Sequence, residues 1–226
     1  MSLVIQQPAP THIAVEGGGS FPVRRVHCVG RNYAEHTREM GGDPAVESPI
    51  FFSKPTDAVF NGVEMPYPPM TEDLHHEVEL VLALKSGGQD IDETDALAHV
   101  YGAAVGIDFT RRDRQAEAKK SGKPWEIAKA FDASGPVGLI RPGLPPEQGE
   151  IGLSVEGQSK QSGELADMIW SCSLIIAHLS RLVRLEAGDL IFTGTPAGVG
   201  PVYPGETVRA YAADLAPLEM IITSPS

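Results

Sequence analysis

Hydrophobic residues occur in short runs along this chain, and glycine and proline separate the runs. The sequence holds 24 glycines and 19 prolines, with clusters at 17–19, 66–69, 142–146 and 196–204. Such punctuation interrupts long helices and favours strands joined by turns. The apolar runs between these clusters predict strands at 26–29, 50–53, 77–84, 101–108, 136–140, 153–155, 189–193, 207–212 and 218–223.

One segment repeats its apolar residues with the period of a helix. In SCSLIIAHLSRLVRLEAGD these residues recur at i, i+4, i+7 and i+8, which places them on one face: Ile175, Leu179, Leu182 and Val183. Ser173 can cap the start, and Gly188 suits the end. The pattern predicts an amphipathic helix that packs on the core through this face.

A second helix is predicted in DFTRRDRQAEAKKSG. Thr110 and Asp113 resemble a capping box there, and Gly122 marks a C-terminal stop. Residues 94–100 are predicted to form a third, shorter helix. Few short helices among many strands define the expected fold class as α+β and strand-dominated.

Charge and cysteine content narrow the function classes. The formal net charge is -12 with a pI near 5.0, which repels nucleic acid and anionic membranes and leaves a small-molecule partner. The apolar runs are too short to span a bilayer, and MSLVIQQPAP lacks the features of a secretion signal, so a cytoplasmic location is expected. Cys28 and Cys172 form no Cys-x-x-Cys pair and are expected to be reduced core residues.

Two carboxylates stand at the head of the apolar run HHEVELVLAL. Glu77 and Glu79 at i and i+2 on a strand share a face, with Cβ atoms about 7 Å apart, which suits convergence on one cation. An exposed strand face is the alternative, but the neighbouring apolar residues imply burial on both faces, where an uncompensated carboxylate is costly. Asp108 ends a second apolar run and offers a third ligand. Three carboxylates suit Mg²⁺ or Mn²⁺, and the pair His75–His76 matches no zinc motif.

A histidine and a glutamate stand three residues apart in CVGRNYAEHTREMGG. His36 and Glu39 share a face if the segment is helical. A surface ion pair is the alternative to a functional pair. The flanking Gly30, Gly41 and Gly42 favour a lid that carries a base over a substrate.

Two further segments offer polar groups next to apolar ones. Lys129 lies among apolar residues in PWEIAKAFD, so its ammonium either contacts a buried anion or extends to solvent. In DLIFTGTPAGVGP a strand leads into a glycine-rich turn without the Gly-Lys-Ser/Thr of a nucleotide-binding loop. Its backbone amides and the hydroxyls of Thr193 and Thr195 can hold a carboxylate.

Taken in order, these segments resemble the fumarylacetoacetate hydrolase family in its short, single-domain form, which includes acylpyruvate hydrolases. The matching blocks are CVGRNYAEH, PIFFSKP, LHHEVEL, GIDFTRRDRQ, KPWEIAKAFD and LIFTGTPAGVGP. The resemblance implies a mixed β-roll or β-sandwich core, a bound Mg²⁺, Mn²⁺ or other divalent cation, and a homodimer. Residues 1–20 match no block and are expected to be an N-terminal extension of a single catalytic domain at 21–226. VEGQSK at 155–160 departs from the Asn-Gly turn expected between two strands.

The resemblance also implies roles for individual residues. They are metal ligation by Glu77, Glu79 and Asp108, catalysis by His36, Glu39 and Lys129, and substrate binding by Gln115 and Thr195. Arg31, Arg111 and Arg112 are further candidates for binding a substrate carboxylate, and Arg31 is the one carried forward.

The leading hypothesis is hydrolysis of a carbon–carbon bond in a 2,4-diketo acid such as fumarylpyruvate. The divalent cation would bind the 1-carboxylate and the 2-oxygen, while His36 and Glu39 activate a water that attacks the 4-carbonyl. Lys129 and Gln115 would stabilise the oxyanion. Oxaloacetate decarboxylation or tautomerisation, and isomerisation of a hydroxymuconate-type diacid, use the same ligands and stay open. A binding protein without catalysis is disfavoured by the presence of His36, Glu39 and Lys129.

Overall fold

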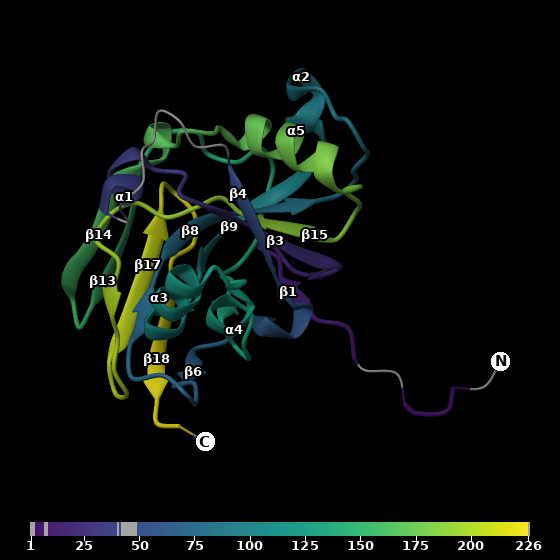
Figure 1. The fold of residues 1–226 in the computed structure, drawn as a ribbon. Helices are drawn as coiled ribbons and strands as arrows, with labels where there is room; N and C mark the ends of the chain where they lie inside the picture. Colours follow the sequence, from purple (N-terminus) through teal and green to yellow (C-terminus); the bar gives the residue numbers. More distant parts are fainter. Residues whose placement is uncertain (1–2, 7–8, 40, 42–48, 226) are drawn as a thin grey trace.

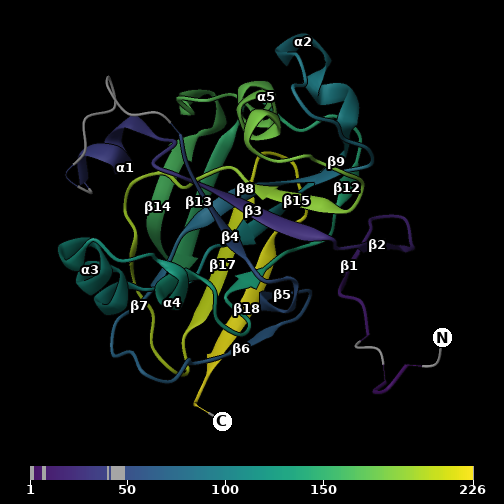
Figure 2. The same cartoon turned by 45° about the vertical axis from the view of Figure 1, so that its right-hand side comes forward.

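The structure is a computed structural model that describes residues 3–6, 9–39, 41 and 49–225. Strands dominate these residues, and two mixed sheets form most of the fold (Figure 1). In Figure 2, as in Figure 1, the strands of the smaller main sheet run steeply across those of the larger one. The predicted strand-dominated α+β class is therefore confirmed.

The larger sheet supplies the strands that carry the predicted metal ligands. It consists of β3 (Arg25–Gly30), β4 (Ile50–Lys54), β8 (Val78–Leu84), β9 (Val100–Ile107), β12 (Arg141–Pro142) and β15 (Asp189–Phe192). Their order is β12-β9-β8-β15-β3-β4, with β15 parallel to β3 and antiparallel to β8. All residues of β8 are buried, as the apolar run predicts for a strand covered on both faces.

The second main sheet covers one face of the first. It consists of β6 (Glu64–Pro66), β13 (Glu150–Val155), β14 (Gln158–Glu164), β17 (Thr207–Ala212) and β18 (Leu218–Thr223). Their order is β14-β13-β17-β18-β6, and only β18 and β6 pair in parallel. The main apolar core contains buried residues from both sheets, such as Leu80, Val105, Leu153 and Ile222. Sheet-on-sheet burial of this kind holds the two sets of strands in a fixed relation.

Short strand pairs complete the fold. They are β1 (His12–Ala14) with β2 (Ser20–Pro22), β5 (Val59–Phe60) with β11 (Gly135–Pro136), and β7 (Leu74–His76) with β10 (Thr110–Arg111) and β16 (Gly200–Pro201). Ile13 and Val15 belong to a second apolar cluster on the other face of the larger sheet. The division between an extension at 1–20 and a catalytic domain stays a prediction.

The amphipathic helix is present as α5 (Cys172–Leu182), which packs on the main core through Ile175 and Leu179, whereas Leu182 of the predicted face is exposed. Both of its predicted ends were wrong. Ser171, not Ser173, caps it, because the Ser171 hydroxyl accepts a hydrogen bond from the Leu174 amide at 3.3 Å. The helix ends at Leu182, and the backbone is already extended at Val183. Gly188, with a positive φ of 93°, lies instead in the turn before β15.

The second predicted helix is α3 (Arg112–Ser121), and Gly122 ends it in a left-handed conformation as predicted. The expected capping box was wrong. Thr110 belongs to β10, and its hydroxyl donates to the Asp108 carbonyl at 3.3 Å. The Asp113 carboxylate instead accepts a hydrogen bond from the Thr71 hydroxyl at 2.6 Å, which ties α3 to the loop before β7.

The remaining helices are short. They are α1 (Ala34–Glu39), α2 (Glu93–Ala96) and α4 (Glu126–Lys129), with 3₁₀ turns at Thr56–Ala58, Leu97–His99 and Leu165–Asp167. The helix predicted at 94–100 is thus α2 followed by a 3₁₀ turn, and Val100 already belongs to β9. In Figure 1, α3 and α4 lie together on one side of the molecule, and α2 lies beside α5.

Two predicted strands differ in the structure, and one predicted hairpin is formed by an unexpected turn. The strand at 77–84 is interrupted, because Glu77 lies between β7 and β8. The strand at 136–140 is wrong as one element, since these residues make only short pairings around β11 and isolated bridges. The hairpin between β13 and β14 is present, and both Glu156 and Gly157 have positive φ, of 49° and 72°. A turn with two positive φ values matches the twist of a two-residue hairpin without the Asn-Gly pair.

Cys28 and Cys172 are both buried and free, as predicted for reduced core cysteines. Among the described residues, no helix has the length and apolar character needed to cross a membrane.

Candidate metal centre and active site

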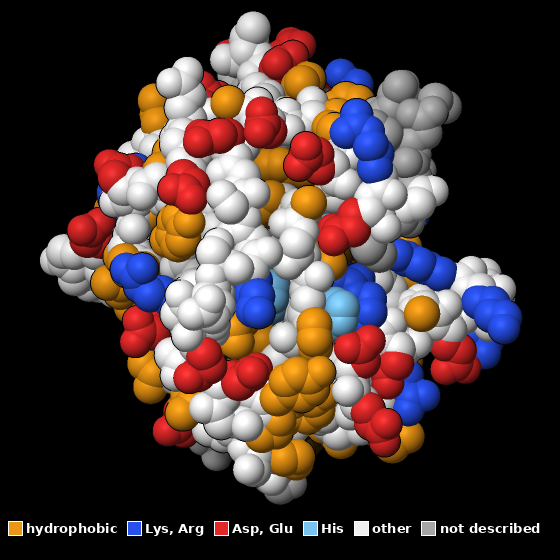
Figure 3. All heavy atoms as spheres, turned by 90° about the vertical axis from the view of Figure 1, so that its left-hand side faces the viewer, with side chains coloured by type: hydrophobic (Ala, Val, Ile, Leu, Met, Phe, Trp, Pro, Cys, Tyr) orange, Lys and Arg blue, Asp and Glu red, His pale blue; other side chains and the backbone are white. Residues whose placement is uncertain are grey.

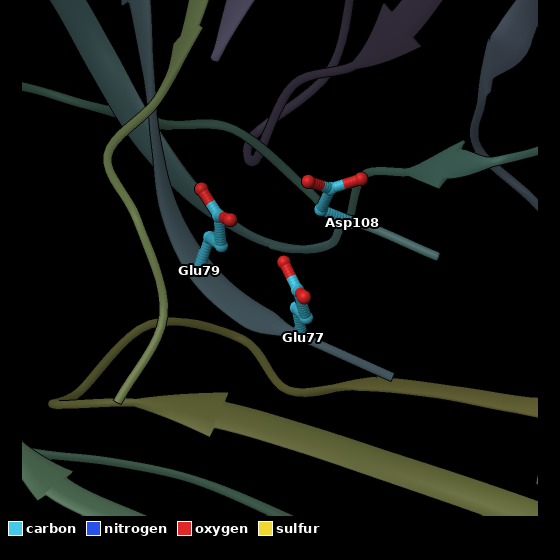
Figure 4. Close-up of side chains that lie close together, drawn as sticks. All are labelled: Glu77, Glu79 and Asp108. Carbon is cyan, nitrogen blue, oxygen red and sulfur yellow. The ribbon is translucent and has the colours of Figure 1, made fainter. Parts of the chain in front are cut away.

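Three carboxylates from two neighbouring strands meet inside the protein. Glu77 directly precedes β8, Glu79 is its second residue, and Asp108 directly follows β9. The antiparallel register pairs Val78 with Ile107, which brings the start of β8 next to the end of β9. One oxygen from each of the three buried carboxylates lies within 4.8 Å of the others. Figure 4 shows the three side chains around one shared space.

The ammonium group of Lys129 lies between two of these carboxylates. Lys129 Nζ donates to Glu77 Oε2 at 2.8 Å, to Asp108 Oδ2 at 2.6 Å and to the Thr110 hydroxyl at 2.6 Å. Its side chain is buried. Of the two alternatives for Lys129, the ammonium therefore contacts buried anions and does not extend to solvent. All three of its protons are used by protein atoms.

Two more basic residues complete the charge balance. Arg112 donates to Glu77 Oε1 at 2.5 Å and, through its other terminal nitrogen, to Gln115 Oε1 at 2.5 Å. Lys54 Nζ lies 2.8 Å from Asp108 Oδ1 and also donates to the main-chain carbonyl of Lys129. Glu77 and Asp108 therefore each contact two cations, and their remaining lone pairs are available to a metal.

The pKa values of Glu77 and Glu79 are shifted in opposite directions. Burial would raise the pKa of Glu77, but Lys129 and Arg112 outweigh burial and hold it below its usual range. The pKa of Glu79 is raised well above its usual value by burial and by the charges of Asp108 and Glu77. Glu79 Oε2 accepts a hydrogen bond from the Gly194 amide at 2.6 Å, and no basic side chain among the described residues forms an ion pair with it. A divalent cation would supply the missing positive charge, so the donor set fits one.

A histidine lies at the same site. His36, on α1, is buried, and its Nδ1 lies 3.2 Å from Glu39 Oε2. Glu39 Oε2 in turn accepts a hydrogen bond from the Gly198 amide at 3.3 Å, which joins α1 to the glycine-rich turn. Burial lowers the pKa of His36, and the charges of Glu77 and Glu39 only partly oppose this effect. The lowered pKa favours the neutral imidazole at pH 7, and in the tautomer that donates Nδ1–H to Glu39, Nε2 is available as a base. The predicted joint at Gly42 lies outside the described residues.

One pocket brings most of the predicted site residues together. Its lining includes His36, Glu77, Glu79, Lys129, Gln115, Thr195 and Arg31, together with Arg112, Lys119, Phe52 and Trp125. Arg31 has a positive φ of 61°, an uncommon conformation for a residue other than glycine and one that recurs at functional sites. The Thr193 hydroxyl was expected to hold a substrate carboxylate, but it donates to the Leu80 carbonyl at 2.9 Å inside the sheet.

Two buried residues of the site, Lys54 and Gln161, were not predicted from the sequence. Lys54 is the next-to-last residue of the matching block PIFFSKP, and its place in that block is the signal that could have identified it. Gln161 lies in the polar strand β14, where nothing in the local pattern marks it. Gln161 Nε2 donates to the Thr195 hydroxyl at 2.8 Å, and its Oε1 accepts from the Val78 amide at 3.0 Å. Because the Thr195 oxygen accepts this bond, its own O–H is free to donate elsewhere.

We expect Lys129→Met to lower the free energy of unfolding of the metal-free protein by about 3–5 kcal/mol, because Glu77 and Asp108 each lose a buried cation. Urea unfolding in EDTA measures this loss, and Mg²⁺ should restore part of it. Lys120→Met on the exposed side of α3 is the control and should change little. Equal unfolding of wild type and Lys129→Met in EDTA would contradict the role of Lys129 as a counter-charge.

The sheet architecture and the carboxylate site define a class of protein. The family model described as fumarylacetoacetate (FAA) hydrolase C-terminal matches residues 25–223. The chain belongs to the fumarylacetoacetate hydrolase family, a family of enzymes, as its sequence blocks predict.

Within the family, the structure resembles fumarylpyruvate hydrolases. The crystal structure of fumarylpyruvate hydrolase from Pseudomonas aeruginosa in complex with Mn²⁺ and pyruvate superposes with a TM-score of 0.96 at 44% identity, covering 99% of this chain and 100% of that chain. A putative fumarylpyruvate hydrolase from Burkholderia cenocepacia gives 0.93 at 48% identity, covering 100% and 96% of the two chains.

Relatives of another activity are also similar. The mitochondrial oxaloacetate tautomerase FAHD1 of Bos taurus is 41% identical over 191 residues, which cover 83% of this chain and 86% of that protein. The Homo sapiens protein of that name is 39% identical over 206 residues, covering 89% and 93%. Family membership therefore does not distinguish a hydrolase from a tautomerase, and the residues of the site must be used to choose between the two reactions.

Proposed function

We propose that this protein is a divalent-metal-dependent hydrolase that cleaves the C3–C4 bond of 2,4-diketo acids to a carboxylic acid and pyruvate. The observation that carries the proposal is a buried His36, whose Nδ1 lies 3.2 Å from Glu39 Oε2, in the pocket that contains Glu77 and Glu79. Hydrolysis needs a base that can activate water next to the cation, whereas decarboxylation needs no attacking water.

Glu77, Glu79 and Asp108 would hold the cation, which we expect to be Mg²⁺ or Mn²⁺ because all three donors are carboxylates. When bound, the cation acts as a Lewis acid that stabilises negative charge on the oxygens of the substrate. The structure with Mn²⁺ and pyruvate from Pseudomonas aeruginosa supports a divalent ion and a pyruvate-like ligand at this kind of site. Lys129 and Arg112 keep Glu77 ionised and ready to bind.

His36 would act as the general base. Its Nε2 accepts a proton from water while the water oxygen bonds to C4, and the Nδ1–H bond to Glu39 holds the ring and stabilises the imidazolium that forms. The C3–C4 bond then breaks, and its electron pair stays on the C3 of the pyruvate portion. The imidazolium can return its proton to C3, which gives pyruvate and a carboxylic acid with no net change in the enzyme.

Polar groups in the pocket are available for the substrate oxygens. The Gln115 oxygen accepts from Arg112, so its NH₂ group can donate to the oxyanion that develops at C4. The Thr195 hydroxyl, held by Gln161, can donate to a carboxylate, and Arg31 lies in the same lining. Lys129 can join them only by releasing one of its three protein partners.

A second candidate is keto–enol tautomerisation of oxaloacetate, which the similarity to the FAHD1 proteins favours. It uses the same carboxylates and needs a base but no attack on C4. Assembly as a homodimer and a cytoplasmic location stay predictions.

Product analysis separates these reactions. Purified protein with Mg²⁺ is assayed on acetylpyruvate, fumarylpyruvate and oxaloacetate, with ultraviolet absorbance reporting the diketo acid and a coupled assay reporting pyruvate. EDTA-sensitive pyruvate from an acylpyruvate, well above that from oxaloacetate, supports hydrolysis. Decay of enol absorbance without pyruvate would assign tautomerisation, and pyruvate from oxaloacetate alone would assign decarboxylation.

A further inference from the structure

Helix α3 turns one row of polar side chains toward the active-site pocket. Arg112, Gln115 and Lys119 stand at i, i+3 and i+7, positions that share a face of a helix, and all three line the pocket. Lys119 lies four residues beyond Gln115, about 6 Å along the helix axis. The row therefore extends from the carboxylate cluster, which Arg112 contacts, toward a more distant part of the pocket.

The ammonium of Lys119 differs from the other cations of the site. Lys54, Lys129 and Arg112 each contact a carboxylate of the metal cluster. Lys119 forms no ion pair with any described carboxylate, and its Nζ lies 5.2 Å from the centre of the Trp125 ring. Partial burial first, and then the positive charges of Arg112 and Arg31, lower the pKa of Lys119 to about 8. A half-buried cation among other cations is stabilised when an anion binds beside it.

We propose that Lys119 binds a second anionic group at the far end of the substrate, so that the enzyme prefers acylpyruvates whose acyl group ends in a carboxylate. This inference rests on the proposed function, because that function places the 2-oxo acid end of the substrate at Glu77, Glu79 and Asp108. The acyl end then extends past Gln115 toward Lys119, along the rings of Phe52 and Trp125. These rings pack edge to face with their centres 6.2 Å apart, and together they offer one apolar wall of the pocket to the acyl carbons.

The acidic surface of the protein makes a local cation necessary for binding a substrate with a second carboxylate. Acidic side chains are spread over the face shown in Figure 3, with basic and histidine side chains among them. On a chain of net charge -12, a dianionic substrate is repelled at long range. Local basic residues must therefore supply the attraction that holds a second carboxylate, and Lys119 is the one whose charge no described carboxylate takes up.

The first test is binding of two non-hydrolysable 2-oxo acids of equal length, measured by calorimetry with Mg²⁺. 2-Oxopimelate carries a carboxylate at its far end, and 2-oxoheptanoate ends in a methyl group. We expect Lys119→Gln to weaken 2-oxopimelate about 10- to 100-fold, the effect of losing one hydrogen bond between charged groups. Binding of 2-oxoheptanoate should change less than about 2-fold, since it has no group that reaches for Lys119.

Lys120→Gln is the matched control, because it removes the same charge from the next, exposed position of α3 and should leave both ligands unchanged. Lys119→Arg keeps the charge and should keep the preference for the diacid. In turnover assays, Lys119→Gln should lower kcat/KM for fumarylpyruvate and spare acetylpyruvate.

Equal binding of 2-oxopimelate by Lys119→Gln and wild type, or equal losses for both ligands, would overturn the proposal. Neither 2-oxo acid has a 4-carbonyl, so neither can be hydrolysed. If wild type cleaves no acylpyruvate, the proposed function fails, while the contrast between the two ligands still decides the role of Lys119.

Discussion

Glu79→Gln is expected to lose metal binding and turnover together while the metal-free protein stays as stable as wild type. The amide has the shape of the carboxyl group but brings no charge to the cation, and Lewis-acid stabilisation of several kcal/mol corresponds to about 10³-fold or more in kcat. Burial and the charges of Asp108 and Glu77 raise the pKa of Glu79, which means that the metal-free site disfavours a charge at this position, so a neutral replacement should cost the metal-free fold little.

Thermal unfolding with and without Mg²⁺ measures the first part of this result. For wild type at an Mg²⁺ concentration about 100-fold above Kd, a ligand that binds only the native state raises the midpoint by roughly 5–10 °C. Glu79→Gln should show no such rise, whereas Glu72→Gln, an exposed control two residues before the β7 strand, should behave as wild type. A full Mg²⁺-dependent rise in Glu79→Gln would remove Glu79 from the ligand set.

His36→Ala should lower kcat by about 10²- to 10⁴-fold, the usual contribution of a general base, and leave metal binding intact. His36 lies in the pocket, and its Nδ1 lies 3.2 Å from Glu39 Oε2. Among the described residues it forms no hydrogen bond with Glu77, Glu79 or Asp108, so its loss should leave the metal ligands in place. Steady-state kinetics on an acylpyruvate, together with Mn²⁺ titration, separates the two effects.

The pH profile provides an independent check on His36. A base is active when unprotonated, and a lowered pKa keeps it unprotonated to a lower pH, so the acid limb of wild-type kcat/KM should lie below the ordinary histidine value of 6.5. His12→Gln, at an exposed position on β1, should leave both rate and limb unchanged. Full activity in His36→Ala would exclude the imidazole as the base.

The sequence could predict the carboxylate cluster because its members stand beside strong apolar runs. Glu77 and Glu79 are conspicuous where burial is expected on both faces, and Asp108 ends the neighbouring run. Glu77 and Glu79 lie at the start of β8, and Asp108 follows the end of β9. These are consecutive strands that pair antiparallel, so recognising the two strands from their local patterns was enough to predict that the three carboxylates meet. The interruption at Glu77 was not predictable, because it depends on pairing of β7 with β10 and β16 rather than on local residue types.

The supporting residues could not be predicted in the same way. Lys54 and Gln161 reach the site from β4 and β14, and only the packed fold brings them within hydrogen-bond distance of Asp108 and Thr195. The predicted start of α3 was wrong for a related reason. At α3 the side chains of Thr110 and Asp113 are taken by tertiary partners, which compete with a local capping box.

In the proposed function, diketo acid hydrolysis depends on one divalent cation held by Glu77, Glu79 and Asp108. This dependence can be measured by titrating metal-depleted protein with Mn²⁺ and following the pyruvate and the carboxylic acid released from an acylpyruvate. We expect no turnover without metal, a rise in activity that saturates at about one Mn²⁺ per chain under tight-binding conditions, and equal amounts of the two products. Turnover in the metal-free protein, or consumption of the acylpyruvate without equal release of both products, would contradict it.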